Sequence, residues 1–248
     1  MELATTDQGA AKKFYTDLFG WTVDDAPMGP DEYYSMFKLD GKDAAAGYTL
    51  RKDQQAQGVP PHWMLYIATD NADDSARRVT ELGGTVLAQP FDVMDVGRMA
   101  VVQDPTGATF CLWQAKKNSG ISAKNTDGAF CWADLNTRDV ARASDFYTQL
   151  FGWKTDKMPG PHEYWHLDTG GPDASPDGGV IKRQNEGHRG IASYVAVTSV
   201  SEWAAKVQKL GGQVVVPKTP VPGMGYFAMC QDTEGNLFGL WETDPNSK

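Results

Sequence analysis

The stretch FYTDLFGW at residues 14–21 returns almost unchanged as FYTQLFGW at residues 146–153. The repeat continues in chain order through three further pairs of segments: MGPDEYY (28–34) with PGPHEYW (159–165), TELGGTV (80–86) with QKLGGQV (208–214), and QDPTGATFCLWQ (103–114) with QDTEGNLFGLWE (231–242). The offset between the copies stays nearly constant, at 132 residues for the first pair and 128 for the last. Ordered matches at so steady a spacing do not arise by chance, so the chain is a duplication.

Each copy shows one strand, one helix and three strands, and runs through this pattern twice. In the first run of copy one, Thr6 or Asp7 is placed to cap a helix that Gly20 ends. The apolar face of this helix consists of Ala11, Phe14, Tyr15, Leu18 and Phe19. In the second run a helix is expected over roughly 72–82, ended by Gly83 and Gly84. The sequence therefore predicts an α+β fold of four βαβββ units.

The polar segment 116–127 separates the two copies. It is rich in Lys, Asn, Ser and Gly and contains too little apolar surface to order itself. We therefore expect a first domain at 1–115, a linker at 116–127 and a second domain at 128–248.

Composition narrows the classes of function. The net charge of -9 lacks the basic surface of a nucleic-acid binder, and no apolar run approaches the roughly 20 residues that span a bilayer. Cys111, Cys131 and Cys230 form no disulfide framework, and the opening MELATTD has no signal-peptide pattern. We expect a cytoplasmic protein, monomer or homodimer, with neither nucleic acid nor membrane as a partner.

The helix ending in LFGW, the helix ending in LGG and the DPxGxxFxLW segment together resemble the vicinal oxygen chelate superfamily, which includes glyoxalase I, bleomycin-resistance proteins and extradiol dioxygenases. The resemblance covers nearly the whole chain and is closest to bacterial tandem glyoxalase-like proteins loosely labelled hydroxylases. It implies that each pair of βαβββ units curls into an incomplete barrel around a cavity. Fold alone does not set the reaction.

Family enzymes hold a divalent metal with His, Glu or Gln on the first and last strands. The first-strand ligand stands seven residues before the aspartate that opens the helix, which gives Trp132 from Asp139 and Trp63 from Asp70, with Ile191 in the matching place of the last unit. The corresponding position of the first unit would precede Met1. The last strands offer Cys111 and Gly239, and a lone buried cysteine is usually packing. The four histidines, His62, His162, His166 and His188, fall on none of these positions. We therefore expect no metal and no other cofactor.

Without metal ligands, the predicted cavities are aromatic. Strand alternation places Trp132, Asp134 and Asn136 on one face, and Cys111 with Trp113 on another. Trp63 would line a further face with Leu65 and Ile67, and Trp241 repeats Trp113. Tyr33 with Tyr34, or Tyr164 with Trp165, could close the walls. Such walls suit a small planar ligand, although aromatic stripes more often only fill a core.

Asp134 is the candidate general acid or base, and Glu2 occupies its place in copy one. Either carboxylate could instead bind a ligand or accept backbone hydrogen bonds. For Arg98, and for Arg51 with its counterpart Arg183, surface ion pairing is the simpler interpretation.

Three functions stay open, and the residues do not decide whether the chain is an enzyme. The first is binding or sequestration of a small planar molecule, as in resistance or secondary metabolism. The second is a metal-independent isomerase or lyase that uses Asp134. The third is a metal-dependent glyoxalase or dioxygenase. Copy two, with Trp132 and Asp134 on a complete first strand, is the better candidate for the working site.

Overall fold

The computed structural model describes residues 1–30, 32–124, 126–160, 162–170, 178–183 and 190–246. Over these residues the chain is α+β, and its elements fall into four successive βαβββ modules, as the repeat predicted. Module 1 contains β1 (Glu2–Thr5), α1 (Gln8–Phe19), β2 (Thr22–Gly29), β3 (Glu32–Leu39) and β4 (Lys42–Thr49). Module 2 contains a first strand in two pieces, β5 (His62–Met64) and β6 (Tyr66–Ala68), then α3 (Ala72–Glu81), β7 (Thr85–Val93), β8 (Gly97–Gln103) and β9 (Thr109–Ala115).

The second copy repeats this order. Module 3 contains β10 (Phe130–Thr137), α4 (Val140–Phe151), β11 (Lys154–Lys157), β12 (Tyr164–Asp168) and β13 (Gly178–Lys182). Module 4 contains β14 (Gly190–Ala196), α5 (Val200–Lys209), β15 (Gln213–Val221), β16 (Gly225–Gln231) and β17 (Leu237–Thr243). The short helix α2 (Lys52–Ala56) follows module 1 and was not predicted.

Helix α1 shows why the repeated FYxxLFGW segment folds as it does. The Asp7 side chain accepts a hydrogen bond from the Ala10 amide at 2.9 Å and so caps the helix. Gly20 ends it in the left-handed conformation, with φ of 74°. The buried residues are those predicted from the sequence: Ala11, Phe14, Tyr15, Leu18 and Phe19.

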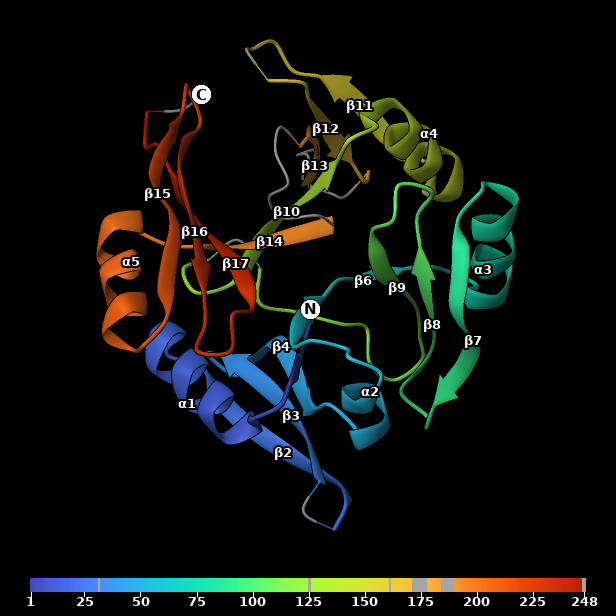
Figure 1. The fold of residues 1–248 in the computed structure, drawn as a ribbon, viewed down its shortest axis with the longest axis horizontal. Helices are drawn as coiled ribbons and strands as arrows, with labels where there is room; N and C mark the ends of the chain where they lie inside the picture. The colour runs from blue at the N-terminus through green and yellow to red at the C-terminus, as the bar shows by residue number, and fades with distance from the viewer. Residues whose placement is uncertain (31, 125, 161, 171–177, 184–189, 247–248) are drawn as a thin grey trace. The chain divides into compact units, whose positions relative to one another are not determined.

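The modules pack into two compact units that are not the two halves of the chain. The first unit contains residues 1–64, 121–131 and 193–248, and thus joins module 1 to module 4. The second unit contains residues 65–120 and 132–192, and joins module 2 to module 3. Helix α1 lies beside α5 in the first, and α3 beside α4 in the second (Figure 1). This packing groups the modules differently from the predicted domains 1–115 and 128–248, because the apolar helix faces meet partners from the other copy.

Each unit contains two runs of hydrogen-bonded strands. In the first unit these are β2-β3-β4-β1-β5 and β14-β17-β16-β15, with β14 counted from Ser193. In the second unit they are β6-β9-β8-β7 and β11-β12-β13-β10, with β10 counted from Trp132. The cores lie between helices and sheets of the paired modules. Phe14, Val207 and Phe238 belong to the core of the first unit, and Phe110, Phe146 and Val180 to that of the second.

A buried tyrosine and a buried aspartate join the two modules of each unit. Tyr15 on α1 donates to Asp232 at 2.9 Å, and Tyr147 on α4 donates to Asp104 at 3.1 Å. Each aspartate stands at the turn of a DPTG or DTEG segment, where its other oxygen accepts backbone amides of that turn. The most similar stretches of the two copies therefore meet at these hydrogen bonds.

The predicted linker is divided between the units, with residues 116–120 in the second and the described residues from 121 onward held to the first. The Ser122 and Ala123 amides donate to the Asp43 carbonyl at 2.7 and 2.9 Å. Ala123 is buried, and the Trp21 indole donates to the Gly128 carbonyl just beyond the segment at 2.8 Å. Backbone hydrogen bonds thus order a segment whose composition suggested none.

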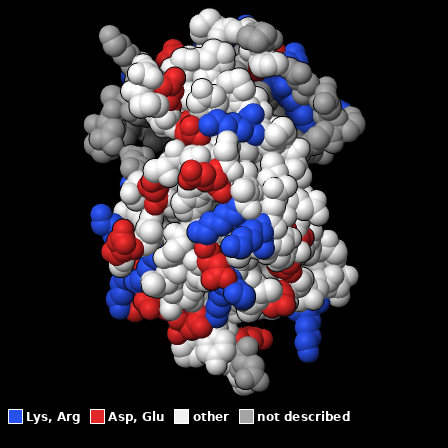
Figure 2. All heavy atoms as spheres, turned by 90° about the vertical axis from the view of Figure 1, so that its left-hand side faces the viewer, with Lys and Arg blue, Asp and Glu red and all other residues white. Residues whose placement is uncertain are grey.

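On the face shown in Figure 2, acidic and basic side chains are interspersed among the described residues. No helix in the described ranges is long and apolar enough to cross a membrane.

Candidate functional site

A hydrogen-bonded polar group on a sheet surface of the second unit is built around Asp134. This residue lies on β10 with only 9% of its surface exposed. Its Oδ1 accepts hydrogen bonds from the Tyr164 hydroxyl at 2.8 Å and from the Trp132 indole at 2.9 Å. Burying a carboxylate costs free energy unless hydrogen-bond donors replace its hydration, and the Tyr164 hydroxyl and the Trp132 indole are such donors.

His166 completes this group, which we call the Asp134 cluster: Trp132, Asp134, Tyr164 and His166. The imidazole lies edge-on to the Trp132 ring, with centroids 5.7 Å apart, and to the Tyr164 ring at 5.5 Å. Its Nε2 is buried and has no hydrogen-bond partner among the described residues. Burial lowers the pKa of His166 below its usual 6.5, and the Asp134 and Asp156 carboxylates only partly oppose this shift.

Strand alternation separates the cluster from the core. Leu135, Leu167 and Val180 project from β10, β12 and β13 into the core that contains α4. The cluster residues stand at the alternate positions and therefore on the opposite face. Gly179 is paired with both Asp134 and His166, and a Cβ there would lie 2.1 Å from the Tyr164 hydroxyl. Glycine at this position lets Tyr164 reach over β13 to Asp134.

The first unit keeps only part of this arrangement. Glu2 on β1 accepts a hydrogen bond from the Tyr34 hydroxyl at 2.7 Å, so the acid–tyrosine pair is repeated. The strand register places Met36 where the second copy has His166, and Ala46 where it has Gly179. The second copy thus has a histidine and a glycine where the first has Met36 and Ala46.

The strand face predicted for Trp63 was wrong, because the helix cap lies one residue later than the sequence suggested. Helix α3 is capped by Asn71, which accepts from the Asp74 amide at 3.1 Å, and not by Asp70. Trp63 therefore lies on the core side, where its indole donates to the Tyr15 hydroxyl at 2.8 Å. Its ring also contacts Phe130, with centroids 5.2 Å apart.

The same correction applies to the last module and changes which residues stand at the family's ligand positions. Helix α5 is capped by Ser199. Counting seven residues back from each cap now gives Met64 in place of Trp63 and Ala192 in place of Ile191, while Trp132 is unchanged. The last strands offer Cys111 and Gly239, and a Cβ on Gly239 would lie 2.0 Å from the Tyr194 ring. Within the described ranges, no three His, Cys, Asp or Glu side chains gather as they would to hold a metal ion. This donor set does not fit the divalent metal that the fold family implies.

The other candidates lie apart from the Asp134 cluster. Cys111 is buried on β9 beside Tyr66. Trp113 covers Gly97, donates to the Asn118 carbonyl at 2.9 Å and lines a pocket of 490 Å³ beside α3. Trp241 in the first unit donates to the Thr243 hydroxyl at 3.0 Å. Asn136 is adjacent to the cluster, since its amide donates to the Asp134 carbonyl at 3.3 Å.

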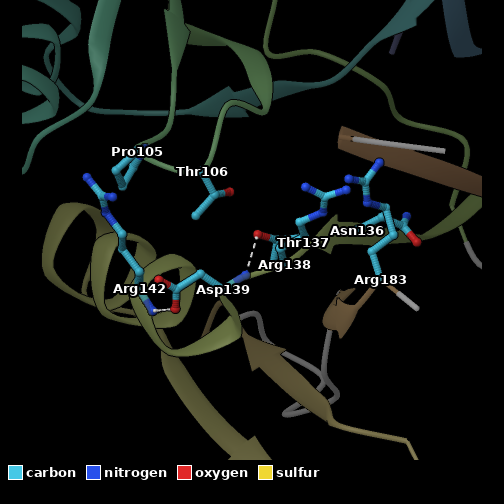
Figure 3. Close-up of a pocket in the computed structure, with 8 residues that line it drawn as sticks. All are labelled: Pro105, Thr106, Asn136, Thr137, Arg138, Asp139, Arg142 and Arg183. Carbon is cyan, nitrogen blue, oxygen red and sulfur yellow. Dashed lines mark hydrogen bonds between the residues drawn. The ribbon is translucent and has the colours of Figure 1, made fainter. Parts of the chain in front are cut away.

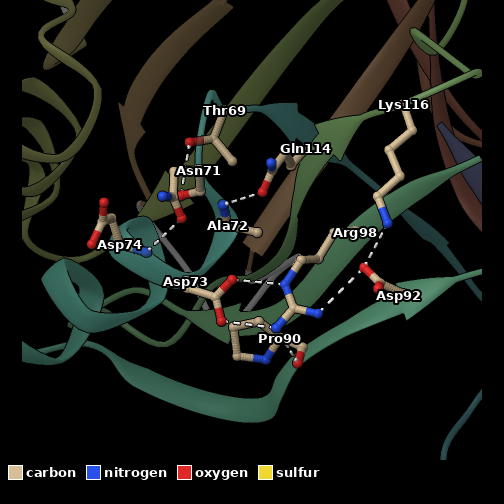
Figure 4. Close-up of polar contacts among 10 residues, drawn as sticks. All are labelled: Thr69, Asn71, Ala72, Asp73, Asp74, Pro90, Asp92, Arg98, Gln114 and Lys116. Atoms are coloured by element: carbon tan, nitrogen blue, oxygen red, sulfur yellow. Dashed lines mark hydrogen bonds and ion pairs between the residues drawn. The ribbon is translucent and has the colours of Figure 1, made fainter.

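Arg98 forms the surface ion pairs that the sequence suggested (Figure 4). Its guanidinium binds both oxygens of Asp73 at 2.7 and 2.8 Å and contacts Asp92 at 3.3 Å. Hydrogen bonding to Asp73 raises the pKa of Arg98, and Lys116 adds a further ion pair to Asp92 at 3.0 Å. Arg51 likewise pairs with Asp53 at 3.1 Å. The Arg98 contacts join β8 to the start of α3 and to β7.

Sequence reasoning missed His166 as a site residue. Only the metal positions were tested for histidine, and His166 is not one of them. The available signal was strand alternation, because His166 follows Tyr164 by two residues on the same strand. By the same alternation Trp165 faces the core and does not share the wall with Tyr164. His188 lies outside the described residues.

Comparison with known proteins identifies the family. The model of the glyoxalase/bleomycin resistance protein/dioxygenase superfamily matches residues 1–112 and again residues 130–240. The chain therefore belongs to this superfamily and contains its domain in tandem.

Relatives and solved structures agree with this assignment. The chain is 36% identical over 251 residues to "Putative glyoxylase CFP32" of Mycobacterium tuberculosis, covering 99% of this chain and 94% of that protein. It is 37% identical over 166 residues to the anthracycline biosynthesis protein DnrV of Streptomyces peucetius, covering 61% of this chain and 58% of DnrV. The Mn(II)-bound glyoxalase of Novosphingobium aromaticivorans shares the fold, with a TM-score of 0.66, 14% identity and coverage of 97% of this chain and 80% of that one.

Proposed function

We propose that the chain binds a small planar or conjugated molecule at the Asp134 cluster of its second unit. The observation that carries this proposal is the buried Nε2 of His166, which stands beside a hydrogen-bonded carboxylate and has no partner among the described residues. An unsatisfied buried polar atom costs about 1–3 kcal/mol, and a bound hydroxyl or carbonyl group would recover that cost.

The surroundings of this atom favour an aromatic ligand. Trp132 and Tyr164 each lie edge-on to His166, and aromatic side chains of this kind favour contact with a flat ligand. The relative DnrV is named for anthracycline biosynthesis, and anthracyclines are conjugated polycyclic compounds. Sequestration or a step of secondary metabolism is the role that fits such a ligand.

We propose that this binding needs no metal held by the protein. The positions from which family enzymes take their ligands hold Trp132, Met64 and Ala192 on first strands, with Cys111 and Gly239 on last strands. Asp134, the carboxylate two residues from Trp132, is engaged by Trp132 and Tyr164.

One observation favours a second candidate, a metal-independent isomerase or lyase. The 2.8 Å hydrogen bond joins the Tyr164 hydroxyl to Asp134, and two groups at this distance can pass a proton between them. In this alternative Asp134 takes a proton from the substrate and returns it to another atom. Tyr164 would hold the carboxylate in position.

Fluorescence titration with an anthracycline as the probe tests the first proposal, since binding beside Trp132 should quench part of the emission of the eight tryptophans. Tyr164→Phe removes one donor of the cluster and should weaken binding roughly tenfold. The matched control is Tyr34→Phe, which removes the same hydroxyl from Glu2 in the first unit and should leave affinity unchanged. Equal effects of both variants would show that the ligand binds elsewhere. No saturable binding by the unaltered protein would contradict the proposal.

Asp134→Asn separates the two candidates. A binding protein should lose affinity in this variant and show no chemical change of the ligand with either form. An enzyme should lose turnover while it retains most of its binding, because the amide keeps the shape of the carboxylate but cannot act as a base.

A further inference from the structure

A second pocket of the second unit lies at the start of α4, and its lining includes Asn136, the neighbour of the Asp134 cluster. It has a volume of 260 Å³, and the described residues that line it include Arg138, Arg142 and Arg183. In the view of Figure 3, Thr106 lies between Arg142 on one side and Arg138 with Arg183 on the other. Guanidinium groups are the side chains best suited to bind carboxylate and phosphate.

The equivalent place in the first unit is filled by the chain's own carboxylate. Glu234, in the DTEG turn, accepts a hydrogen bond from the Thr6 amide at 2.9 Å. It also accepts hydrogen bonds from the hydroxyls of Thr5 and Thr6, just before α1. The first unit therefore accommodates a carboxylate between the DTEG turn and the start of α1.

At the corresponding positions the second unit has lost this negative charge and gained positive ones. Thr106 stands where the first unit has Glu234, so the built-in carboxylate is gone. Arg138 replaces Thr6, and Arg142 replaces Ala10.

The third arginine follows from the strand register. The Arg183 amide donates to the Thr137 carbonyl as the Leu50 amide donates to the Thr5 carbonyl. Arg183 therefore replaces Leu50, and its predicted match with Arg51 was wrong by one residue. Beside the helix-capping carboxylate of Asp139, the pocket that lost a negative charge is thus lined by three arginines, in a chain whose net charge is -9. Their mutual repulsion favours an anion among them.

We propose that this pocket binds an oxyanion, the carboxylate or phosphate group of a small molecule, in the place that Glu234 fills in the first unit. The proposal is independent of ligand binding at the Asp134 cluster.

Calorimetric titration with inorganic phosphate, and separately with acetate, at constant ionic strength in chloride tests it. The unaltered protein should bind at least one of the two probes saturably, and the one it prefers identifies the anion. Thr106→Glu restores the carboxylate of the first unit and should weaken binding roughly tenfold or more. Arg142→Ala should do the same, and the first unit already has alanine at this helix position, so the variant is expected to fold.

Arg77→Ala is the matched control, because it removes one arginine from α3, where Arg77 pairs with Asp74 and Glu81 away from the pocket. It should bind the probe as the unaltered protein does. The proposal is overturned if neither probe binds saturably, or if Thr106→Glu and Arg142→Ala bind as tightly as Arg77→Ala.

Discussion

His166 shows at the scale of one residue what the repeat alone could not reveal. Its counterpart in the first unit is Met36, so the duplication gives no sign that a titratable group belongs at this position. Asp134 and Trp132 could be predicted as neighbours on one face because they stand two residues apart on one strand. The contribution of β12 depends on pairing across β13, and on Gly179 leaving room for Tyr164.

The lowered pKa of His166 has a consequence for stability. The unfolded chain takes up a proton near pH 6.5, while the folded chain, in which the imidazole is buried, resists protonation. The contribution of His166 to stability is therefore complete above pH 6.5 and declines as the pH falls below that value. His166→Met, which copies the first unit, should lose less stability than the unaltered protein between pH 7.5 and 5.5. Urea unfolding at the two pH values measures this, and equal losses would contradict it.

At the scale of the element, the helix ends decided how well strand faces could be predicted. Asp139 was identified correctly as a cap, and of the two predicted candidates Thr6 and Asp7 the structure has Asp7. For α3, Asp70 and Asn71 are adjacent residues that both favour the cap position, and composition does not choose between them. The choice of Asp70 moved Trp63 to the wrong face, because one residue reverses the side of a strand.

The equivalent tyrosines of α1 and α4 allow the stability contributed by their hydrogen bonds to be compared between the two units. Tyr147→Phe removes a single hydrogen bond to buried Asp104 and should lower the free energy of unfolding by about 1–3 kcal/mol. Tyr15→Phe should cost more, because this hydroxyl both donates to Asp232 and accepts from the Trp63 indole. Denaturant unfolding compares the variants, and an equal or smaller loss for Tyr15→Phe would argue against the Trp63 contact.

At the scale of the whole molecule, a sequence repeat shows which modules share an origin and not which modules pack together. The similarity between copies predicted four modules in the correct order. Their grouping into units depends on contacts such as Tyr15 with Asp232, whose residues are separated by most of the chain. Both partners belong to repeated motifs, so each tyrosine has two equivalent aspartates in the sequence. Only the folded chain distinguishes them.

This grouping predicts the behaviour of the chain when it is divided within 116–127. The fragment 128–248 contains modules 3 and 4, and each has lost the module against which its helix packs. Tyr147 would lack Asp104 and the ring of Phe110, whose centroid lies 5.6 Å from its own. On the α5 side, Phe238 would lack Phe14, with centroids 6.3 Å apart. The fragment should therefore not form a compact monomer.

Size-exclusion chromatography and denaturant unfolding of the separate and mixed fragments measure this. The fragment 128–248 alone should self-associate, because module 3 of one copy can supply the missing partner to module 4 of another, or should unfold without a cooperative transition. Mixing it with 1–118 should restore one species with cooperative unfolding. A compact, cooperatively unfolding monomer of either fragment would show that each half carries its own core, as the continuous domains 1–115 and 128–248 require.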